Sequence, residues 1–370
     1  MKIGCVKEIK LHEYRVGLTP SNVRSYVAHG HQVMIEKGAG EGSAFCDEEY
    51  AAAGATIADN AKTVWDNSQL IVKVKEPLES EYQYFHKDLI IYAYFHMAAV
   101  PQLANELIKK HVHSVAYETV TDDLGDLPLL KPMSEIAGRL SIQEGAKYLE
   151  KPYGGRGVLL PGVPGVAKGH VTILGTGVVG TNACKLAVGM GADVTIIGRN
   201  NARLAQLDDM FGARVQTLFS TEESILSALK QADLIIGAVL ITGASTPKLI
   251  KRKYLSQMKP GSVIVDVSID QGGCCETSKI TYHDDPVYTV DGVIHYCVGN
   301  MPGAVPRTST ISLTNATTQF GLIIADNGLK EACKKDKRVA EGVNIYGGHC
   351  VHENIANSLN LKYTNLSELI

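Results

Sequence analysis

The amino-acid sequence predicts an α/β protein of two domains, each built on a parallel sheet covered by helices. Three observations support this fold class. The chain has 370 residues, more than a single hydrophobic core usually holds. Short, continuous apolar runs alternate with helical stretches in two separate series, a pattern typical of strands buried in parallel sheets. The second series contains a glycine-rich turn, GTGVVG at 175–180, directly after an apolar run.

The composition is that of an ordinary globular protein. Hydrophobic residues make up 45% of the chain and charged residues 20%, with a formal net charge of -3. Because a nucleic-acid surface needs a basic excess, we expect a small-molecule partner and no nucleic acid. The start MKIGCVKEIK lacks the apolar stretch of a secretory signal, and runs such as DLIIGAVLI (233–241) are shorter than a membrane span. We therefore expect a cytoplasmic protein without a membrane partner.

The cysteines do not suggest a metal site or a disulfide framework. Eight are present, without a CxxC pair, and most lie in apolar, strand-like contexts. Reduced cysteines in such places behave as small core residues. We therefore expect free thiols in the core and assign no metal ligands.

The first series of strands lies in the N-terminal third of the chain. The expected strands are the apolar runs at 2–6, 31–37, 70–75, 89–96 and 113–118. A break with two prolines, GDLPLLKP, follows at 125–132. The next stretch, 134–150, begins with Ser134 in an N-cap position and has apolar residues at helical spacing. We expect a long helix here, connecting the two domains.

The second series matches a Rossmann-type, doubly wound sheet. Its expected strands are the runs at 170–175, 193–198, 214–219, 233–240, 262–270 and 293–300. The helical tail, from about 313 to 328 and again near the C-terminus, is too short to form a domain, so we expect it to pack on the N-terminal domain. The expected domains are a dinucleotide-binding domain at 129–306 and a discontinuous substrate domain at 1–128 and 307–370.

The turn GTGVVG predicts a phosphate-binding loop. Gly175, Gly177 and Gly180 satisfy the pattern GxGxxG, between an apolar strand and a helix. The free N–H groups and the dipole at the start of such a helix can hold a pyrophosphate. The alternative is a tight turn that needs glycine for close packing and binds nothing.

The next strand, VTIIGRN at 194–200, lacks the acid that usually hydrogen-bonds the adenosine ribose. Gly198 and Arg199 stand there, and Arg203 follows in the next helix. Without a carboxylate nothing repels a 2′-phosphate, and a nearby guanidinium can pair with it. The sequence therefore favours NADP or tolerance of both NAD and NADP. Alternatively, Arg199 points to solvent and NAD binds through the backbone and Arg203.

Three expected strands end in a titratable residue, namely Lys75, His96 and Asp270. Each one alone is more often structural, but ligands of open α/β sheets bind beyond the carboxyl ends of the strands. Together they favour a cleft between the domains that is suited to carbonyl–amine redox chemistry. Lys75 can polarise a substrate oxygen there, while His96 and Asp270 exchange protons. The segment 295–310 carries Asn300, expected either on the nicotinamide side or in a plain turn between domains.

Several long motifs together resemble the alanine dehydrogenase family, which also includes pyridine nucleotide transhydrogenases. The motifs are KEIKLHEYRVGLTP (7–20), KVKEP (73–77), YFHMA (94–98), PMSEIAGRLS (132–141), GTGVVG, VIVDVSIDQGG (263–273) and NMPGAVPRTST (300–310). The resemblance implies reversible oxidative deamination of L-alanine to pyruvate and ammonium, with a nicotinamide cofactor. It also implies a homo-oligomer, typically a hexamer, and a discontinuous substrate domain.

The same resemblance implies roles for individual residues. Arg15 is expected to clamp the substrate carboxylate and Lys75 to contact the substrate oxygen, with His96 and Asp270 as acid/base residues. The residues expected to line the cofactor, besides the phosphate loop and Asp270, are Ser134, Val178, Val179, Arg203, Ser220, Val239, Leu240, Asn300 and Met301.

The sequence departs from the family pattern at two cofactor positions. Gly198, followed by Arg199, stands where the family has its ribose-binding Asp. In the loop after Asp270, where the family has a basic residue, this chain has Lys279, which is a milder change. Neither position belongs to the reacting centre, but the first leaves the choice between NAD and NADP open.

Other functions are possible for this fold. The main alternative is the nucleotide-binding subunit of a proton-translocating transhydrogenase, which would dock on a membrane protein. The joint presence of Arg15, Lys75, His96 and Asp270 argues against it. A nucleotide-sensing protein without turnover and an enzyme of saccharopine type with a larger substrate are two further alternatives.

Overall fold

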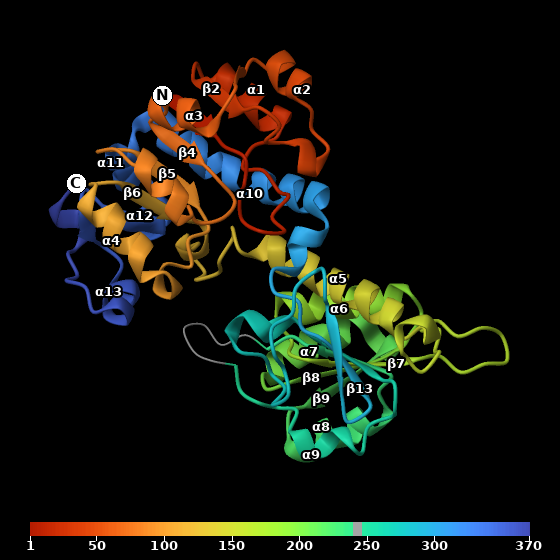
Figure 1. The fold of residues 1–370 in the computed structure, drawn as a ribbon. Helices are drawn as coiled ribbons and strands as arrows, with labels where there is room; N and C mark the ends of the chain where they lie inside the picture. The colour runs from red at the N-terminus through yellow and green to blue at the C-terminus, as the bar shows by residue number, and fades with distance from the viewer. Residues whose placement is uncertain (240–245) are drawn as a thin grey trace. The chain divides into compact units, whose positions relative to one another are not determined.

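The structure is a computed structural model that describes residues 1–239 and 246–370. The chain forms two compact units, Met1–Met133 with Gly303–Ile370, and Ser134–Pro302 (Figure 1). The domain boundaries expected at 128/129 and 306/307 lie a few residues from these. The cleft expected between the domains stays a prediction.

Among the described residues, the first unit is built on an eight-stranded sheet. The strands β3, β2, β1, β4, β5 and β6, named in their spatial order, pair in parallel. β14 and β15 extend the sheet beyond β6 in antiparallel pairing. In spatial order the strands are β3 (Thr56–Ala58), β2 (Gln32–Glu36), β1 (Lys2–Cys5), β4 (Leu70–Val72), β5 (Ile90–Ala93), β6 (His113–Ala116), β14 (Val343–Tyr346) and β15 (His349–Cys350). Each of the five expected runs contains one of these strands. β3, β14 and β15 were not expected.

The helices of this unit come from both ends of the chain. They are α1 (Pro20–Ala28), α2 (Asp47–Ala52), α3 (Ala61–Asn67), α4 (Pro101–Lys109), α10 (Pro306–Asn327), α11 (Leu329–Lys335), α12 (Lys337–Gly342) and α13 (Glu353–Leu359). Thr19 begins α1 with a capping box, and Pro20 occupies the first turn, where a missing N–H costs nothing.

The C-terminal tail is part of the first unit. The backbone N–H of Val16 donates to Thr310 Oγ1 of α10 (3.2 Å), and the hydroxyl of Tyr92 donates to the carbonyl of Thr317 (3.1 Å). Ile345 of β14 and Ile355 of α13 belong to the same buried cluster as Trp65 and Phe95. The two ends of the chain therefore share one hydrophobic core.

The second unit is built on a seven-stranded sheet within the described residues. Its strands in spatial order are β12 (Val287–Val290), β13 (Val293–Tyr296), β11 (Val263–Asp266), β10 (Leu234–Gly237), β7 (His170–Leu174), β8 (Asp193–Gly198) and β9 (Val215–Phe219). All pairs are parallel except β12 with β13. The chain starts in the middle at β7, winds outward to β9, and then crosses to β10 on the other side. This order is the doubly wound order predicted for a dinucleotide-binding domain.

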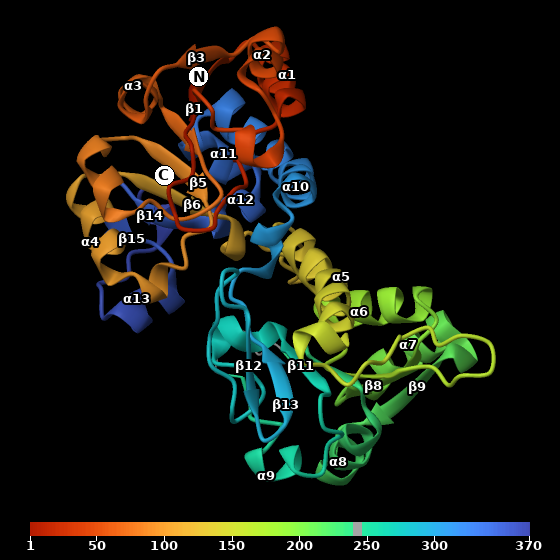
Figure 2. The same ribbon diagram turned by 45° about the vertical axis from the view of Figure 1, so that its right-hand side comes forward.

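The helices of this unit cover both faces of the sheet. They are α5 (Lys131–Tyr148), α6 (Val178–Gly189), α7 (Asn201–Phe211), α8 (Glu222–Gln231) and α9 (Arg252–Leu255). In Figure 2, α5 and α6 lie on one side of the sheet, and α8 and α9 lie on the other. The first residues of α5 precede the boundary between the units.

The helix expected at 134–150 begins earlier than predicted. α5 starts at Lys131, so Ser134 lies inside its first turn and is not its N-cap. Pro132 explains the difference, because proline fits the first turn of a helix and sets the backbone angle that a helix needs.

All eight cysteines are free thiols, and seven of them are buried. Among the described helices, none combines the length and the apolar character that crossing a bilayer requires.

Candidate functional site

In the first unit, Lys75 and His96 lie just beyond the carboxyl ends of neighbouring strands. The strands themselves end at Val72 and Ala93, so the prediction that the two residues close their strands was wrong by a few residues. The extended pairing continues past these ends, because the N–H of Tyr94 donates to the carbonyl of Val74 (3.0 Å). Both side chains still belong to the edge of the sheet where ligands bind in this fold class.

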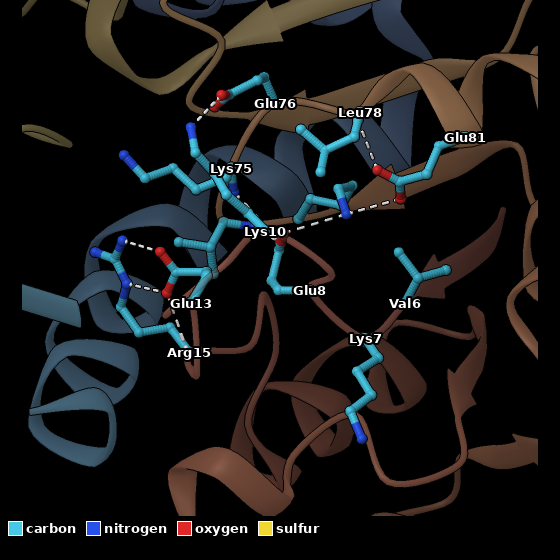
Figure 3. A network of polar contacts seen from close by, with 12 residues as sticks. Val6, Lys7, Glu8, Lys10, Glu13, Arg15, Lys75, Glu76, Leu78 and Glu81 are labelled. Atoms are coloured by element: carbon cyan, nitrogen blue, oxygen red, sulfur yellow. Dashed lines mark hydrogen bonds and ion pairs between the residues drawn. The ribbon is translucent and has the colours of Figure 1, made fainter. Parts of the chain in front are cut away.

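Arg15 is buried and held by a carboxylate. Only 2% of its surface is exposed, against the usual surface position of arginine. Its Nε donates to Glu13 Oε1 (2.6 Å) and its Nη2 to Glu13 Oε2 (2.5 Å), a two-pronged ion pair (Figure 3). Its Nη1 donates to the sulfur of Met133 (3.0 Å). Glu13 therefore fixes the plane of the guanidinium, and the group is suited to bind a planar carboxylate.

Lys75 carries a charge that its surroundings disfavour. Burial lowers its pKa, and the nearby charge of Arg15 lowers it further. Its Nζ lies 6.0 Å from the ring centroid of Tyr94, and its backbone N–H donates to Glu8 Oε1 (3.3 Å). A partly desolvated cation beside a second cation is stabilised when an anion binds.

A second buried ion network supports the loop of Lys75. Lys73 Nζ lies 3.0 Å from Glu81 Oε1 and 3.2 Å from Glu8 Oε2. Burial works against the charge of Lys73, but Glu8 and Glu81 together raise its pKa. Glu8 also accepts the N–H of Val74 (2.6 Å) and thereby ties this network to the chain next to Lys75. Lys10, whose side chain is partly exposed, forms an ion pair with Glu76.

His96 has an unusual backbone, and the residue keeps contact with solvent although surrounding protein covers much of its ring. It adopts the left-handed conformation (φ 47°, ψ 40°) at the start of a short helix, Met97–Ala99. Its ring stacks on Tyr94 with 6.5 Å between centroids. The pKa of His96 is lowered to about 4, first because surrounding protein withdraws the ring from water and second because of the charge of Lys75. At neutral pH the imidazole is therefore uncharged and can accept a proton.

In the second unit, the loop between β7 and α6 has the shape of a phosphate cradle. Gly175 has a φ of +116°, and a Cβ there would come within 2.2 Å of the carbonyl oxygen of Ala238. A Cβ on Gly180 would lie 1.9 Å from the carbonyl oxygen of Gly175. A Cβ on Gly177 would meet no described atom within 4 Å, so this position borders open space. Two glycines therefore permit close packing, and the third leaves room where a pyrophosphate can approach the helix.

The start of α6 supplies the donors for that cradle. Gly177 is its N-cap, and Val178 and Val179 form its first turn with N–H groups facing the loop side of the helix. Arg203 braces the loop, since its Nε donates to the carbonyl of Thr176 (3.0 Å) and its Nη2 to Thr181 Oγ1 (2.8 Å). These residues fit a dinucleotide.

Gly198, Arg199 and Ser220, which were predicted to lie at the ribose end of a cofactor site, stand at or just past the ends of β8 and β9. The N–H of Ser220 donates to the carbonyl of Gly198 (2.8 Å), which joins β9 to the end of β8. A Cβ on Gly198 would lie 2.4 Å from Thr176 Cγ2, so the threonine fills the space of a side chain here. Arg199 is exposed directly after the strand.

Asp270 does not end its strand, contrary to our prediction. β11 ends at Asp266, and Asp270 lies in the short helix that follows, Val267–Gln271. The buried carboxylate of Asp266 accepts from the N–H of Cys274 (2.8 Å) and from Ser278 Oγ (2.6 Å), and so shapes the loop. Because a Cβ on Gly299 would lie 3.1 Å from Asp270 Oδ1, glycine there lets the segment of Asn300 pass close to Asp270.

The other predicted cofactor residues are spread over this unit. The N–H of Val239 donates to Ser268 Oγ (3.0 Å), which places it beside the helix of Asp270. Lys279 Nζ lies over the ring of Tyr288 (4.4 Å), while Met301 is buried at the start of a short helix and Ser134 lies in α5. Leu240 lies outside the described residues.

The carboxylates were missed by reasoning from sequence. Glu8, Glu13 and Glu118 all contact the backbone or side chains of predicted site residues. Glu8 and Glu13 stand in the quoted motif KEIKLHEYRVGLTP, and an acid two positions before a predicted substrate arginine was the available signal.

Comparison with known proteins agrees with this site. The chain matches "Alanine dehydrogenase/PNT, N-terminal domain" over residues 4–137 and "Alanine dehydrogenase/PNT, C-terminal domain" over 141–353. It is 54% identical to an alanine dehydrogenase of Bacillus subtilis over 98% of this chain and 96% of that one. It is 50% identical to an alanine dehydrogenase of Halomonas elongata over the full length of both. A solved structure titled L-alanine dehydrogenase matches with a TM-score of 0.95 and 49% identity, covering 97% of this chain and 99% of that chain.

The fold and the cofactor loop define a nicotinamide-dependent oxidoreductase. The chain belongs to the alanine dehydrogenase/PNT family. Within that family it matches alanine dehydrogenases at about 50% identity over nearly the whole chain, as the sequence predicted. A transhydrogenase from Sinorhizobium meliloti matches with a TM-score of 0.82 but 22% identity, over 95% of this chain and 99% of that chain, and this likeness shows a shared fold alone.

Proposed function

We propose that this chain catalyses the reversible oxidative deamination of L-alanine to pyruvate and ammonium, and that it uses NADPH as well as NADH. The observation that carries the substrate assignment is the pair of cations Arg15 and Lys75 in the first unit. Glu13 balances the charge of Arg15, while the surroundings of Lys75 lower its pKa. The group therefore favours one added negative charge, which is the charge of an alanine or pyruvate carboxylate.

The roles follow from the donors available. Arg15, held flat by Glu13, clamps the substrate carboxylate, and Lys75 contacts the substrate oxygen. A bound nicotinamide cofactor supplies the hydride acceptor for deamination. Loss of a hydride from Cα and of a proton from the nitrogen gives the imine. His96, uncharged at neutral pH, takes a proton from the water that adds to the imine carbon, and ammonia then leaves to give pyruvate. Asp270 serves as the second acid/base residue.

The cofactor preference rests on the ribose end of the second unit. Gly198 offers no carboxylate, and exposed Arg199 follows it directly. A hydrogen bond between Arg199 and a 2′-phosphate contributes about 1.5–3 kcal/mol, which corresponds to roughly ten- to a hundred-fold in affinity. Arg203 is occupied by Thr176 and Thr181, and this favours Arg199 as the residue that reads the phosphate. Gly175, Gly177, Gly180, Val178 and Val179 hold the pyrophosphate.

The first test compares kcat/KM for pyruvate amination with NADH and with NADPH. We expect comparable values for the wild type, and a loss of about ten-fold or more for NADPH alone in Arg199→Ala. Turnover with NADH alone would refute the cofactor proposal. An absence of turnover with both cofactors would favour the nucleotide-sensing alternative. A scan of amino acids distinguishes an enzyme of saccharopine type, which would turn over a larger substrate.

The assembly and location are proposed on the family resemblance. We propose a homohexamer in the cytoplasm. Light scattering coupled to size-exclusion chromatography measures the number of subunits directly, and a monomeric or dimeric mass would contradict the hexamer.

A further inference from the structure

We propose that Glu118 is a positioning residue for His96, and that it sets the rate of the reaction by holding the backbone that presents the imidazole. This inference rests on the proposed role of His96 as an acid/base residue. Glu118 lies just beyond β6, in the short helix Tyr117–Thr119. Its Oε1 accepts from the N–H of His96 (2.6 Å) and from the N–H of Phe95 (3.0 Å), and its Oε2 lies 3.3 Å from the N of Phe95.

The sheet register brings Glu118 to this place. β5 and β6 pair in parallel, with Ala93 opposite Ala116. Continuing this register by two residues on each strand sets Phe95 opposite Glu118. The regular ladder has ended at this point, so the N–H groups of Phe95 and His96 need acceptors from elsewhere. The carboxylate of Glu118 satisfies two consecutive N–H groups.

The conformation of His96 needs such support. A left-handed backbone is unfavourable for a residue with a Cβ, and it persists only where surrounding contacts determine it. The imidazole can turn about its own bonds, but the direction of its Cβ is set by this backbone. Removing the acceptor of the His96 N–H therefore releases the backbone and moves the imidazole away from its working position.

Glu118 is not itself placed as an acid or base. Its oxygens are engaged by backbone N–H groups. Burial raises the pKa of Glu118, and these hydrogen bonds together with the charge of Lys75 limit the rise. Glu8 likewise accepts the backbone N–H of Lys75 (3.3 Å), whereas Glu13 binds the guanidinium of Arg15 directly.

The test is a double-mutant cycle with Glu118→Ala, His96→Ala and the double variant, in the full-length protein. The measured quantities are kcat and KM for pyruvate amination and the thermal midpoint. A displacement of about 1 Å costs roughly a hundred-fold in rate, so we expect Glu118→Ala to lower kcat by about that factor. KM for pyruvate should change less than about three-fold, because Arg15 keeps its own partner. In the His96→Ala background, Glu118→Ala should not lower the residual rate further.

A matched control is Glu49→Ala. The carboxylate of Glu49 also accepts a backbone N–H, from Cys46 (2.9 Å), but at the start of α2. It should leave kcat and KM unchanged. Glu118→Gln keeps one oxygen acceptor and should lose about ten-fold in kcat, so it carries the test if Glu118→Ala does not fold.

Several outcomes overturn the inference. These are a wild-type kcat in Glu118→Gln, a rise in KM without a fall in kcat, or equal losses from Glu118→Ala with and without His96. Wild-type turnover in His96→Ala would instead refute the proposed role of His96. If His96→Ala is inactive and both Glu118 variants are fully active, the role of His96 stands and the positioning role of Glu118 fails.

Discussion

Replacing Glu13 by Gln tests whether the buried ion pair shapes the substrate clamp. Glu13 is 5% exposed and Arg15 is 2% exposed, and two charged hydrogen bonds of 2.6 and 2.5 Å join them. Glutamine keeps one acceptor oxygen and turns an NH2 group towards an arginine donor. One charged hydrogen bond, worth about 1.5–3 kcal/mol, is lost, and the arginine charge remains buried without a counter-charge. Breaking a buried pair from one side costs about 3–5 kcal/mol.

We therefore expect Glu13→Gln to lower the free energy of unfolding by about 3–5 kcal/mol. Urea unfolding followed by circular dichroism measures this as a lower midpoint at an unchanged slope. KM for pyruvate should rise with little change in kcat, because the carboxylate contact is made before and during the reaction.

The chain contains a matched control. Arg338 Nε and Nη2 donate to Asp336 Oδ1 (3.0 Å) and Oδ2 (2.6 Å), with the same two-residue spacing and the same two-pronged geometry. The side chains of this pair are more exposed than those of Glu13 and Arg15, with 39% of Arg338 and 12% of Asp336 accessible to solvent. Asp336→Asn should cost only about 0–1 kcal/mol, because exposed pairs are screened and asparagine still caps α12. Equal costs for the two variants would refute the argument from burial, and an unchanged KM in Glu13→Gln would refute its role in the clamp.

Three further predictions concern the acid/base residue and the cofactor. His96→Ala should reduce alanine turnover to a low residual rate while NADH binding, followed by fluorescence, stays the same. Intact turnover would mean that another group moves the proton. Because the pKa of His96 is lowered to about 4, the uncharged ring predominates above that pH. The value of kcat/KM should therefore stay constant on acidification to about pH 5 and decrease below it. A decrease of kcat/KM near the ordinary pKa of histidine would contradict the lowered pKa. Gly198→Asp alone should gain little activity with NADH, because the new Cβ would lie 2.4 Å from Thr176 Cγ2. The double variant with Thr176→Ala should raise the NADH-to-NADPH ratio of kcat/KM by roughly ten-fold or more. An equal ratio in the single and double variants would exclude Thr176 as the obstacle.

The fold was predictable because its signals are local. Each expected apolar run contains a strand, and GTGVVG lies between β7 and α6 as its pattern requires. β15 was missed because it has two residues, too few to show a period. The start of α5 was placed late because Ser134 was read as an N-cap, although Pro132 allows an earlier start.

The site was predictable only in part. The residues expected to touch substrate, Arg15, Lys75 and His96, lie near one edge of one sheet, but Asp270 lies past its strand and not at its end. The length of a strand depends on pairing with its neighbours, and pairing is not visible in a single run of residues. Asp266, the true last residue of β11, has a structural role that its position alone did not reveal.

The carboxylates around the site follow from physics that a sequence can in principle express. A cation or a strained backbone held partly away from water needs a buried acceptor, and a carboxylate is the strongest one available. For Arg15 this acceptor stands two residues earlier in the chain, so it could be found from the sequence alone. For His96 it stands two residues beyond the end of β6, and finding it requires the register between β5 and β6. Once strands are assigned in a parallel sheet, an acid just past the end of one strand is therefore a candidate hydrogen-bond acceptor for the loop that follows the neighbouring strand. The kinetics of the Glu118 variants can test this rule.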